Sequence, residues 1–175
     1  MVAVTGGGAY ALSDLEIEPG EDQNGGWAWD AGLRVGRGRG SLGVGYERMR
    51  LDLRADGKST TSAIYLEPRF TLGMPTGGVQ PYLFAHGARI FDYDVRLCCR
   101  LNNATSSGDG WMVGGGFGLI TRPVGTVRFD LSAGVHRLSG ESEDNTGFGP
   151  WKGAGPIIDV RLGASVPLTR GSGMR

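Results

Sequence analysis

The sequence predicts an all-β fold: a closed, antiparallel, up-and-down β-barrel of eight strands, in a single domain over residues 1–175. Apolar residues recur at every second position along most of the chain, which is the period of a strand with one apolar face. Helix-type periodicity is almost absent, and the 33 glycines are spread throughout. The connections between the apolar runs alternate between short and long, which is typical of a meander with tight turns at one end and loops at the other.

The first four expected strands cover residues 4–17, 27–36, 41–54 and 60–72. The first is rich in glycine, whereas the second, WAWDAGLRVG, alternates strictly between apolar and small or charged residues. In the third strand the apolar positions change parity between Tyr46 and Met49, so we expect a β-bulge at Glu47–Arg48. The fourth strand again places aliphatic and polar residues on opposite faces.

The last four expected strands cover residues 79–97, 110–122, 126–138 and 153–168. In the fifth strand Tyr93 falls on the apolar face with Phe91, and Asp92 falls on the polar face. The sixth strand alternates apolar residues with glycine, and the last two alternate aliphatic with charged residues. The links after the second, fourth and sixth strands are short, so an even number of strands places both chain ends at the short-turn side.

The polar face of these strands has the composition of a sealed interior. It carries acidic and basic side chains in similar numbers, and its basic members are all arginine, which pairs bidentately with buried carboxylates. Lys58 and Lys152 are the only lysines of the chain. Glycine on the same face leaves room for large side chains in the narrow lumen of an eight-stranded barrel. We therefore expect this face to line the lumen and the apolar face to contact lipid, as in a transmembrane β-barrel.

Two groups of residues follow from this orientation. Charges inside the lumen must pair, because an unpaired buried ion is strongly destabilising. The expected interior ionic network comprises Asp30, Arg34, Arg50, Asp52, Glu67, Arg69, Arg128, Asp130, Asp159 and Arg161. Aromatic residues gather near the long-loop ends of the strands, and Trp and Tyr favour the membrane–water interface. The expected interfacial aromatic belt comprises Trp27, Trp29, Tyr93, Trp111 and Trp151.

The meander and the segments WAWDAGLRVG, QPYLFAHGARIFDYD and VRFDLSAGVHRL resemble the small bacterial outer-membrane β-barrels, such as the eight-stranded transmembrane domain of outer membrane protein A. The resemblance covers about residues 4–168 and implies a location in the bacterial outer membrane, with its lipid bilayer as partner. The last strand ends GASVPLTRGSGMR, without the closing Phe or Trp that this group usually has. The implied protein is a monomer with a structural or surface-interaction role, a plugged polar interior and long extracellular loops available to an extracellular ligand.

Two alternatives remain open at this stage. A lipid A-modifying enzyme of the deacylase type would use His136 as the base and Ser139 as the nucleophile. The spacing does not match the His-x-Ser of that family, and parity points His136 into the lumen. A soluble barrel that binds a small ligand would suit the start of the chain, MVAVTGGGAY, which has neither the basic nor the apolar region of a leader. We expect no catalytic residues, and we expect the leader to be absent from this sequence.

Other classes of function have little support in the sequence. The formal net charge is zero, so no nucleic-acid partner is expected. Gly38 to Gly43 match GxGxxG, but a hairpin turn and a strand surround them, so we expect no nucleotide and no other cofactor. His86 and His136 are too few for a predicted metal site. Cys98 and Cys99 fit no metal-ligand spacing, and the sequence leaves open whether they are free thiols or a vicinal disulfide.

Overall fold

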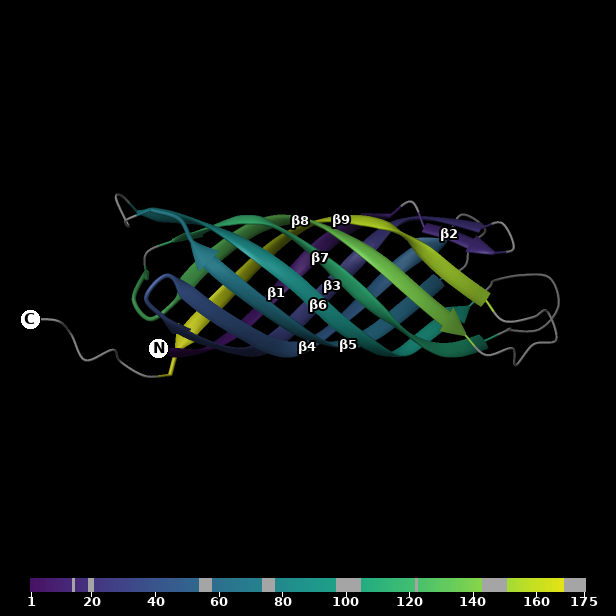
Figure 1. Cartoon of the computed structure of the whole chain (residues 1–175), viewed down its shortest axis with the longest axis horizontal. Helices are drawn as coiled ribbons and strands as arrows, with labels where there is room; N and C mark the ends of the chain where they lie inside the picture. The colour runs from purple at the N-terminus through teal and green to yellow at the C-terminus, as the bar shows by residue number, and fades with distance from the viewer. Residues whose placement is uncertain are drawn as a thin grey trace, which may run out of the picture.

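The computed structural model describes residues 1–13, 15–18, 21–53, 58–73, 78–96, 105–121, 123–142 and 151–168, which form one antiparallel barrel (Figure 1). Its strands are β1 (Val2–Ser13), β2 (Leu15–Glu18), β3 (Glu21–Arg37), β4 (Gly40–Leu53), β5 (Lys58–Thr71), β6 (Val79–Arg96), β7 (Thr105–Thr121), β8 (Arg128–Ser142) and β9 (Trp151–Pro167). From β3 to β9 each strand pairs with the next, and β1 closes the barrel on β9. The short β2 continues the line of β1, because both pair with β3 and β9.

Counting β1 and β2 as one, the strands make a closed eight-stranded barrel, so the predicted fold class is confirmed. Several strands are longer than expected at the long-loop end: β3 begins at Glu21, β7 begins at Thr105 and β8 continues to Ser142. Within the described residues, no helix has the length and apolar character needed to cross a membrane.

The short connections and the start of the chain lie at one end of the barrel, on the left of Figure 1. The Met1 amine donates to the Gly36 carbonyl oxygen at 2.9 Å, and the Leu168 amide donates to the Val2 carbonyl oxygen at 2.8 Å. Gly38 and Gly125 occupy two of the turns at φ 64° and 65°, a conformation that glycine adopts at little cost. The start of the chain and the end of β9 therefore lie at the short-turn side, in agreement with the prediction that an even number of strands brings the chain ends there, and β2 lies at the opposite end.

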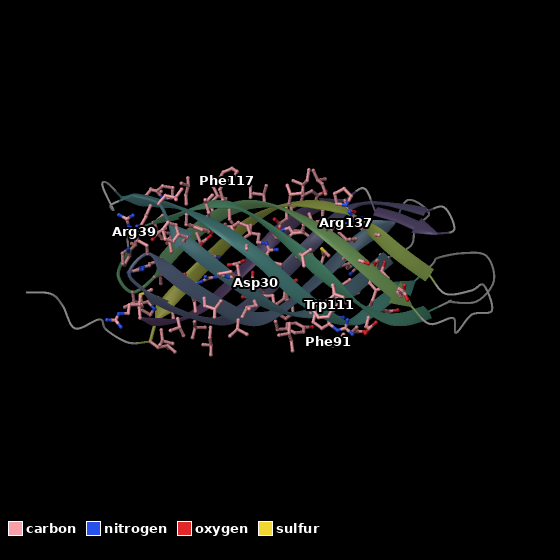
Figure 2. The ribbon with its side chains drawn as sticks, in the orientation of Figure 1. Asp30, Arg39, Phe91, Trp111, Phe117 and Arg137 are labelled. Atoms are coloured by element: carbon pink, nitrogen blue, oxygen red, sulfur yellow. The ribbon has the colours of Figure 1, made fainter. Side chains whose placement is uncertain are left out.

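The wall of the barrel is apolar on its outer surface. Phe91, Trp111 and Phe117 project away from the ribbon in Figure 2, whereas Asp30 lies within it. Leu33, Val44, Leu66, Leu83, Leu131, Val160 and Leu162 are among the exposed residues of this wall. A soluble barrel would bury such residues in its core. The exposed apolar wall therefore favours the transmembrane interpretation over the soluble alternative.

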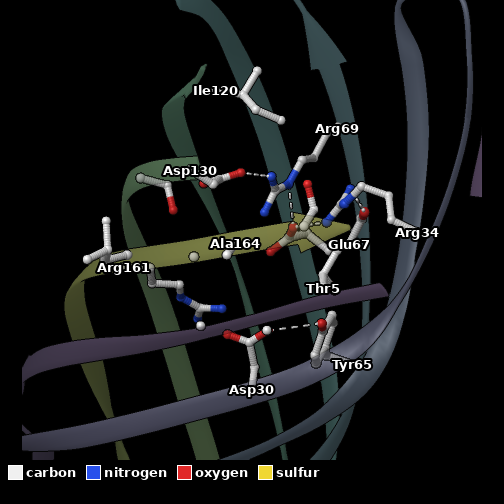
Figure 3. Close-up of a pocket in the computed structure, with 16 residues that line it drawn as sticks. Thr5, Asp30, Arg34, Tyr65, Glu67, Arg69, Ile120, Asp130, Arg161 and Ala164 are labelled. Carbon is white, nitrogen blue, oxygen red and sulfur yellow. Dashed lines mark hydrogen bonds and ion pairs between the residues drawn. The ribbon is translucent and has the colours of Figure 1, made fainter. Parts of the chain in front are cut away.

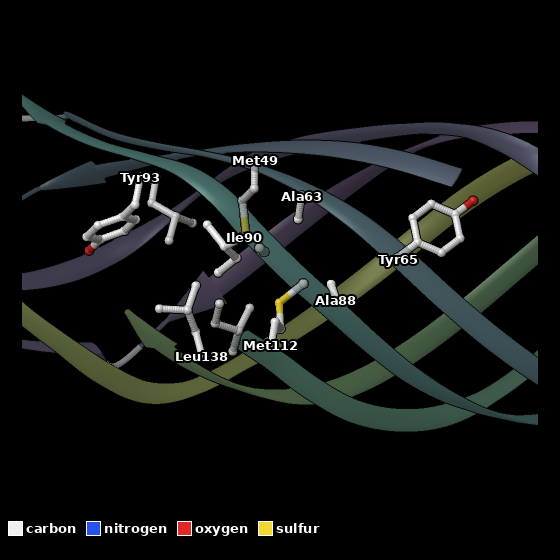
Figure 4. Close-up of a cluster of buried hydrophobic side chains, with 11 residues drawn as sticks. Met49, Ala63, Tyr65, Ala88, Ile90, Tyr93, Met112 and Leu138 are labelled. Atoms are coloured by element: carbon white, nitrogen blue, oxygen red, sulfur yellow. The ribbon is translucent and has the colours of Figure 1, made fainter. Parts of the chain in front are cut away.

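Towards the long-loop end, the two faces exchange their character. The interior there is filled by a buried cluster, which we call the apolar cap: Ala11, Met49, Leu51, Ala63, Tyr65, Ala88, Ile90, Tyr93, Met112, Leu138 and Ile157 (Figure 4). Exposed polar side chains flank the cap residues of β4, β6 and β8: Arg48, Arg50, Asp52, Arg89, Arg137 and Ser139. The outward neighbours of Ala11, Tyr65 and Met112 are instead apolar, so only part of the cap lies beyond the apolar wall. An apolar inside and a polar outside are typical of a barrel in water. We interpret this part as a section that projects beyond the apolar wall.

The predicted bulge at Glu47–Arg48 is wrong. β4 pairs in unbroken register with β3 from Gly25 to Arg37 and with β5 from Lys58 to Phe70. Because the register does not slip, Met49 and Leu51 point inward, and Arg50 and Asp52 are exposed on the outer surface. Arg50 and Asp52 are therefore not members of an interior network, contrary to the prediction.

The register shift on these central strands lies instead in β6. Ser62 pairs with Asp92, but the next residue, Ala63, pairs with Ile90, which leaves Phe91 as an extra residue. A bulge of this kind reverses the side on which the following residues lie. Tyr93 is therefore 1% exposed inside the barrel and Asp92 is exposed outside, so the prediction that Tyr93 belongs to the aromatic belt is wrong.

Candidate functional site

The first half of the lumen network is centred on Glu67, which β5 presents between two arginines. The Arg34 guanidinium donates to Glu67 Oε1 at 2.5 Å, and Arg69 Nε donates to the same oxygen at 2.7 Å. Arg69 also pairs with Asp130 of β8, whose other oxygen accepts a hydrogen bond from the Tyr82 hydroxyl at 2.5 Å. Buried Arg–carboxylate pairs are stable only when their remaining donors and acceptors are also satisfied. These side chains of β3, β5, β6 and β8 therefore form one connected group.

The second half of the network is centred on Arg161 of β9. Arg161 pairs with Asp159 on its own strand and with Glu47 Oε2 of β4 at 3.8 Å. His136 Nε2 lies 3.2 Å from Asp159 Oδ1. Glu47 and Asp159 thus flank a single guanidinium, and Asp159 also contacts His136.

His86 joins the two halves. Its Nε2 lies 3.4 Å from Glu47 Oε1, and its Nδ1 lies 3.6 Å from Glu67 Oε2. The Tyr65 ring stacks on the His86 ring with the centroids 5.5 Å apart, and the His136 ring meets it edge-on at 5.0 Å. The ionic groups therefore form a continuous chain across the lumen from Arg34 to Asp159.

The structure assembles most, but not all, of the predicted network. Arg34, Glu67, Arg69, Asp130, Asp159 and Arg161 lie together as above, and Asp30 accepts a hydrogen bond from the Tyr65 hydroxyl at 3.3 Å. Arg128 is half-buried near the short-turn end and has no ion pair with another described residue. Glu47, His86 and His136 were left out of the predicted network, although strand parity alone places all three on the inner face.

Inward-facing glycines make room for the largest side chains of the network. A Cβ on Gly43 would lie 2.6 Å from the Arg34 guanidinium. A Cβ on Gly118 would overlap the Tyr82 ring, whose hydroxyl donates to Asp130. The arginine and tyrosine side chains thus pack directly against the backbone of these glycines.

Gly118→Ala is expected to destabilise the barrel by about 1–3 kcal/mol, because Tyr82 must move away from Asp130. Gly87→Ala is the matched control, since a Cβ there meets nothing within 4 Å. The free energy of unfolding of the two variants in urea, measured in lipid vesicles, checks this. Equal stabilities of the two variants would show that the glycine at position 118 does not position Tyr82.

The space left between these groups is small. One cavity of about 50 Å³ lies beside Asp30, Arg34, Glu67, Arg69 and Arg161 (Figure 3). Its walls carry charged groups of both signs, which dashed lines join in pairs in the figure. Such a cavity has room for a few buried water molecules, which would hydrogen-bond the remaining polar atoms.

Aromatic side chains lie on the outer surface near the long-loop end of the apolar wall. The rings of Tyr10 and Trp27 meet edge-on at 5.1 Å, and those of Trp29 and Tyr46 lie 5.3 Å apart. On the other side of the barrel the Arg89 guanidinium lies 4.6 Å over the Trp111 ring. Trp27, Trp29 and Trp111 are 69%, 50% and 58% exposed, so these three members of the predicted belt lie on the outer surface. The side chain of Trp151 lies outside the described residues.

Solved structures share this architecture at low sequence identity. Neisserial surface protein A (NspA) superposes with a TM-score of 0.68 at 14% identity, over 94% of this chain and 96% of that chain. The chain has the fold of a small bacterial outer-membrane β-barrel. The outer membrane protein OprG from Pseudomonas aeruginosa has a TM-score of 0.54 at 12% identity, over 94% of both chains. The attachment invasion locus protein Ail of Yersinia pestis has a TM-score of 0.52 at 14% identity, over 94% of this chain and 96% of that chain.

No protein-family model and no curated protein matches the sequence. The fold is that of proteins embedded in the outer membrane, in agreement with the predicted location.

The arrangement of His136 and Ser139 does not suit the deacylase-type chemistry. His136 is buried in the lumen, where its Nε2 faces Asp159, whereas Ser139 is exposed on the outer surface of the same strand. A general base must come within hydrogen-bond reach of its nucleophile. The two side chains lie on opposite sides of the barrel wall, so they cannot act as this pair. Among the described residues, no group of three or more His, Cys, Asp or Glu is placed to hold a metal ion.

Proposed function

We propose that this chain is an integral β-barrel of the bacterial outer membrane with a structural or surface-interaction role and a closed lumen. The observation that carries this proposal is that two interior layers follow one another along the barrel axis. They are the ionic network and, nearer the long-loop end, the apolar cap. Together they occupy the space through which a solute would have to pass.

The closed lumen of this proposal rests on how the described residues fill the interior. An eight-stranded barrel encloses little more than the volume of its own inward side chains. Here the cap residues Ile90, Tyr93, Leu138 and Ile157 are each at most 1% exposed, and the cavity described within the network has a volume of only about 50 Å³. A water-filled passage for ions or nutrients does not fit this packing.

The proposed contact surface is the end of the barrel that bears the long connections. The residues that join β4 to β5, β6 to β7 and β8 to β9 include 54–57, 97–104 and 143–150, each of which contains charged or amide side chains in sequence, and they lie outside the described residues. Loops on a rigid scaffold commonly carry binding functions. We propose that they contact an extracellular ligand while the barrel, as a monomer without a cofactor, anchors them.

Conductance across a planar lipid bilayer tests the closed lumen. The wild-type protein is expected to insert from detergent and to produce no stepwise current, because the cap and the network block the axis. The barrel domain of a general porin, added under the same conditions, is the positive control. Reproducible conductance steps from the purified protein would contradict the closed lumen, and a monomer that stays in solution without detergent would contradict the membrane location.

Incubation with lipid A separates this proposal from the enzyme alternative. Wild-type protein and His136→Ala are both expected to release no more fatty acid than a protein-free blank. The His136→Ala variant should differ from wild type only in stability, because it removes a partner of Asp159. Release of acyl chains by the wild type that is abolished in His136→Ala would overturn the non-enzymatic role.

A further inference from the structure

Three basic side chains gather on the outer surface just above the aromatic belt. Cross-strand pairing places Arg48 beside Trp29 and Arg50 beside Trp27, and Lys58 lies on the next strand, opposite Asp52. Together with Thr60 and Asp94, these side chains line an open depression of about 560 Å³ over β3 to β6. The depression is therefore basic on one side and bordered by two exposed indole rings.

The three cations differ from the arginines of the lumen in having no partner within the described structure. Arg34, Arg69 and Arg161 are each held by carboxylates, whereas Arg48, Arg50 and Lys58 form no hydrogen bond or ion pair with another described residue. Lys58 is also one of only two lysines in the chain. Positive charge is thus available to a ligand in this depression.

The acidic residues nearby do not cancel this charge by direct pairing. Asp92 accepts a hydrogen bond from the Ser62 hydroxyl at 3.4 Å, and Asp94 is half-buried at the far edge of the depression and has an interaction of its own. Asp52 lies opposite Lys58 in the register but forms no ion pair with it. The acidic groups border the depression and leave the guanidinium groups of Arg48 and Arg50 open.

We propose that this depression binds the phosphate-bearing headgroup of an anionic lipid in the outer leaflet. The apolar wall below the belt contacts acyl chains, so a lipid lying against Val44 and Tyr46 would bring its headgroup level with Arg48 and Arg50. Indole rings favour this interfacial depth, and basic residues just above it attract lipid phosphate. The inference rests on the proposed membrane embedding and adds a specific lipid site to it.

Retention of lipid by the purified full chain in native mass spectrometry tests the site. The probes are mixed micelles that contain either phosphatidylglycerol or phosphatidylcholine. The wild type is expected to retain phosphatidylglycerol preferentially, and the variant Arg48→Gln/Arg50→Gln/Lys58→Gln to lose roughly tenfold in apparent affinity for it. Inorganic phosphate at millimolar concentration is expected not to displace the lipid, because it lacks the acyl chains that the wall holds.

Arg37→Gln/Arg39→Gln is the control, because these two residues are exposed at the opposite, short-turn end. It should retain phosphatidylglycerol as the wild type does. Equal retention by the wild type and the triple variant, equal retention of the two lipids, or displacement by inorganic phosphate would each overturn the site. Failure of the membrane embedding itself would appear differently, as a protein that stays monomeric in solution without detergent.

Discussion

Glu67→Gln is expected to lower the free energy of unfolding by about 3 kcal/mol or more. The substitution keeps the shape of the side chain but removes the charge that faces two buried arginines, Arg34 at 2.5 Å and Arg69 at 2.7 Å. Removing one partner of a buried ion pair typically costs about 3–5 kcal/mol, because the other charge stays buried without compensation. His86, which lies 3.6 Å from Glu67, also loses a charged neighbour.

Unfolding in urea, followed by tryptophan fluorescence in lipid vesicles, measures this loss. Asp52→Asn is the matched control, because it makes the same chemical change at an exposed position outside the barrel. It should change stability by no more than about 0.5 kcal/mol. If Glu67→Gln proved as harmless as Asp52→Asn, the ionic network would contribute nothing to stability.

Leu162→Arg is expected to destabilise the protein in lipid by about 2–4 kcal/mol. Leu162 is 64% exposed, lies in the middle of the outward-facing run of β9 and pairs with Leu131 of β8. If the wall contacts hydrocarbon, a guanidinium there must be buried in the bilayer or must distort it, and the penalty is largest near the bilayer midplane.

Ser139→Arg provides the comparison, since Ser139 is exposed on β8 among the polar side chains beyond the wall. It should cost only about 0–1 kcal/mol. Urea unfolding of both variants in vesicles gives the two values. Similar values for the two positions would show that the apolar wall does not lie in the membrane.

The architecture was predictable because strand periodicity and connection length are local signals. WAWDAGLRVG alternates along its whole length, and β3 places Trp27, Trp29 and Leu33 outside and Arg34 inside, as that alternation requires. The Arg-rich polar face likewise indicated buried charges, and six of its predicted members meet in the lumen. These residues needed no information beyond parity.

The errors share one cause, the assumption that apolar residues face outward along the full length of each strand. Met49 and Leu51 break the parity of Leu42 and Val44, and a bulge was the explanation that kept them outside. The register of β4 is continuous, so Met49 and Leu51 stay on the inner face. The interior of the barrel changes from polar to apolar along this strand, and the pairing does not shift. In β6 the opposite occurs: no parity change appears in the sequence at Tyr93, yet a bulge at Phe91 turns it inward. Local sequence does not distinguish these cases, because cross-strand pairing decides them.

Spin labels at two positions on the same outer face of β4 give the most direct test of the inside-out wall and of the level where it ends. Val44→Cys and Arg50→Cys, each labelled in a Cys98→Ser/Cys99→Ser background in lipid vesicles, would be compared for collision with dissolved oxygen and with a water-soluble nickel chelate. Oxygen concentrates in hydrocarbon and the chelate stays in water, so we expect the label at 44 to favour oxygen and the label at 50 to favour nickel. If both labels favoured nickel, the wall would not face lipid. If both labels favoured oxygen, the lipid-facing wall would extend past Arg48 instead of ending before it.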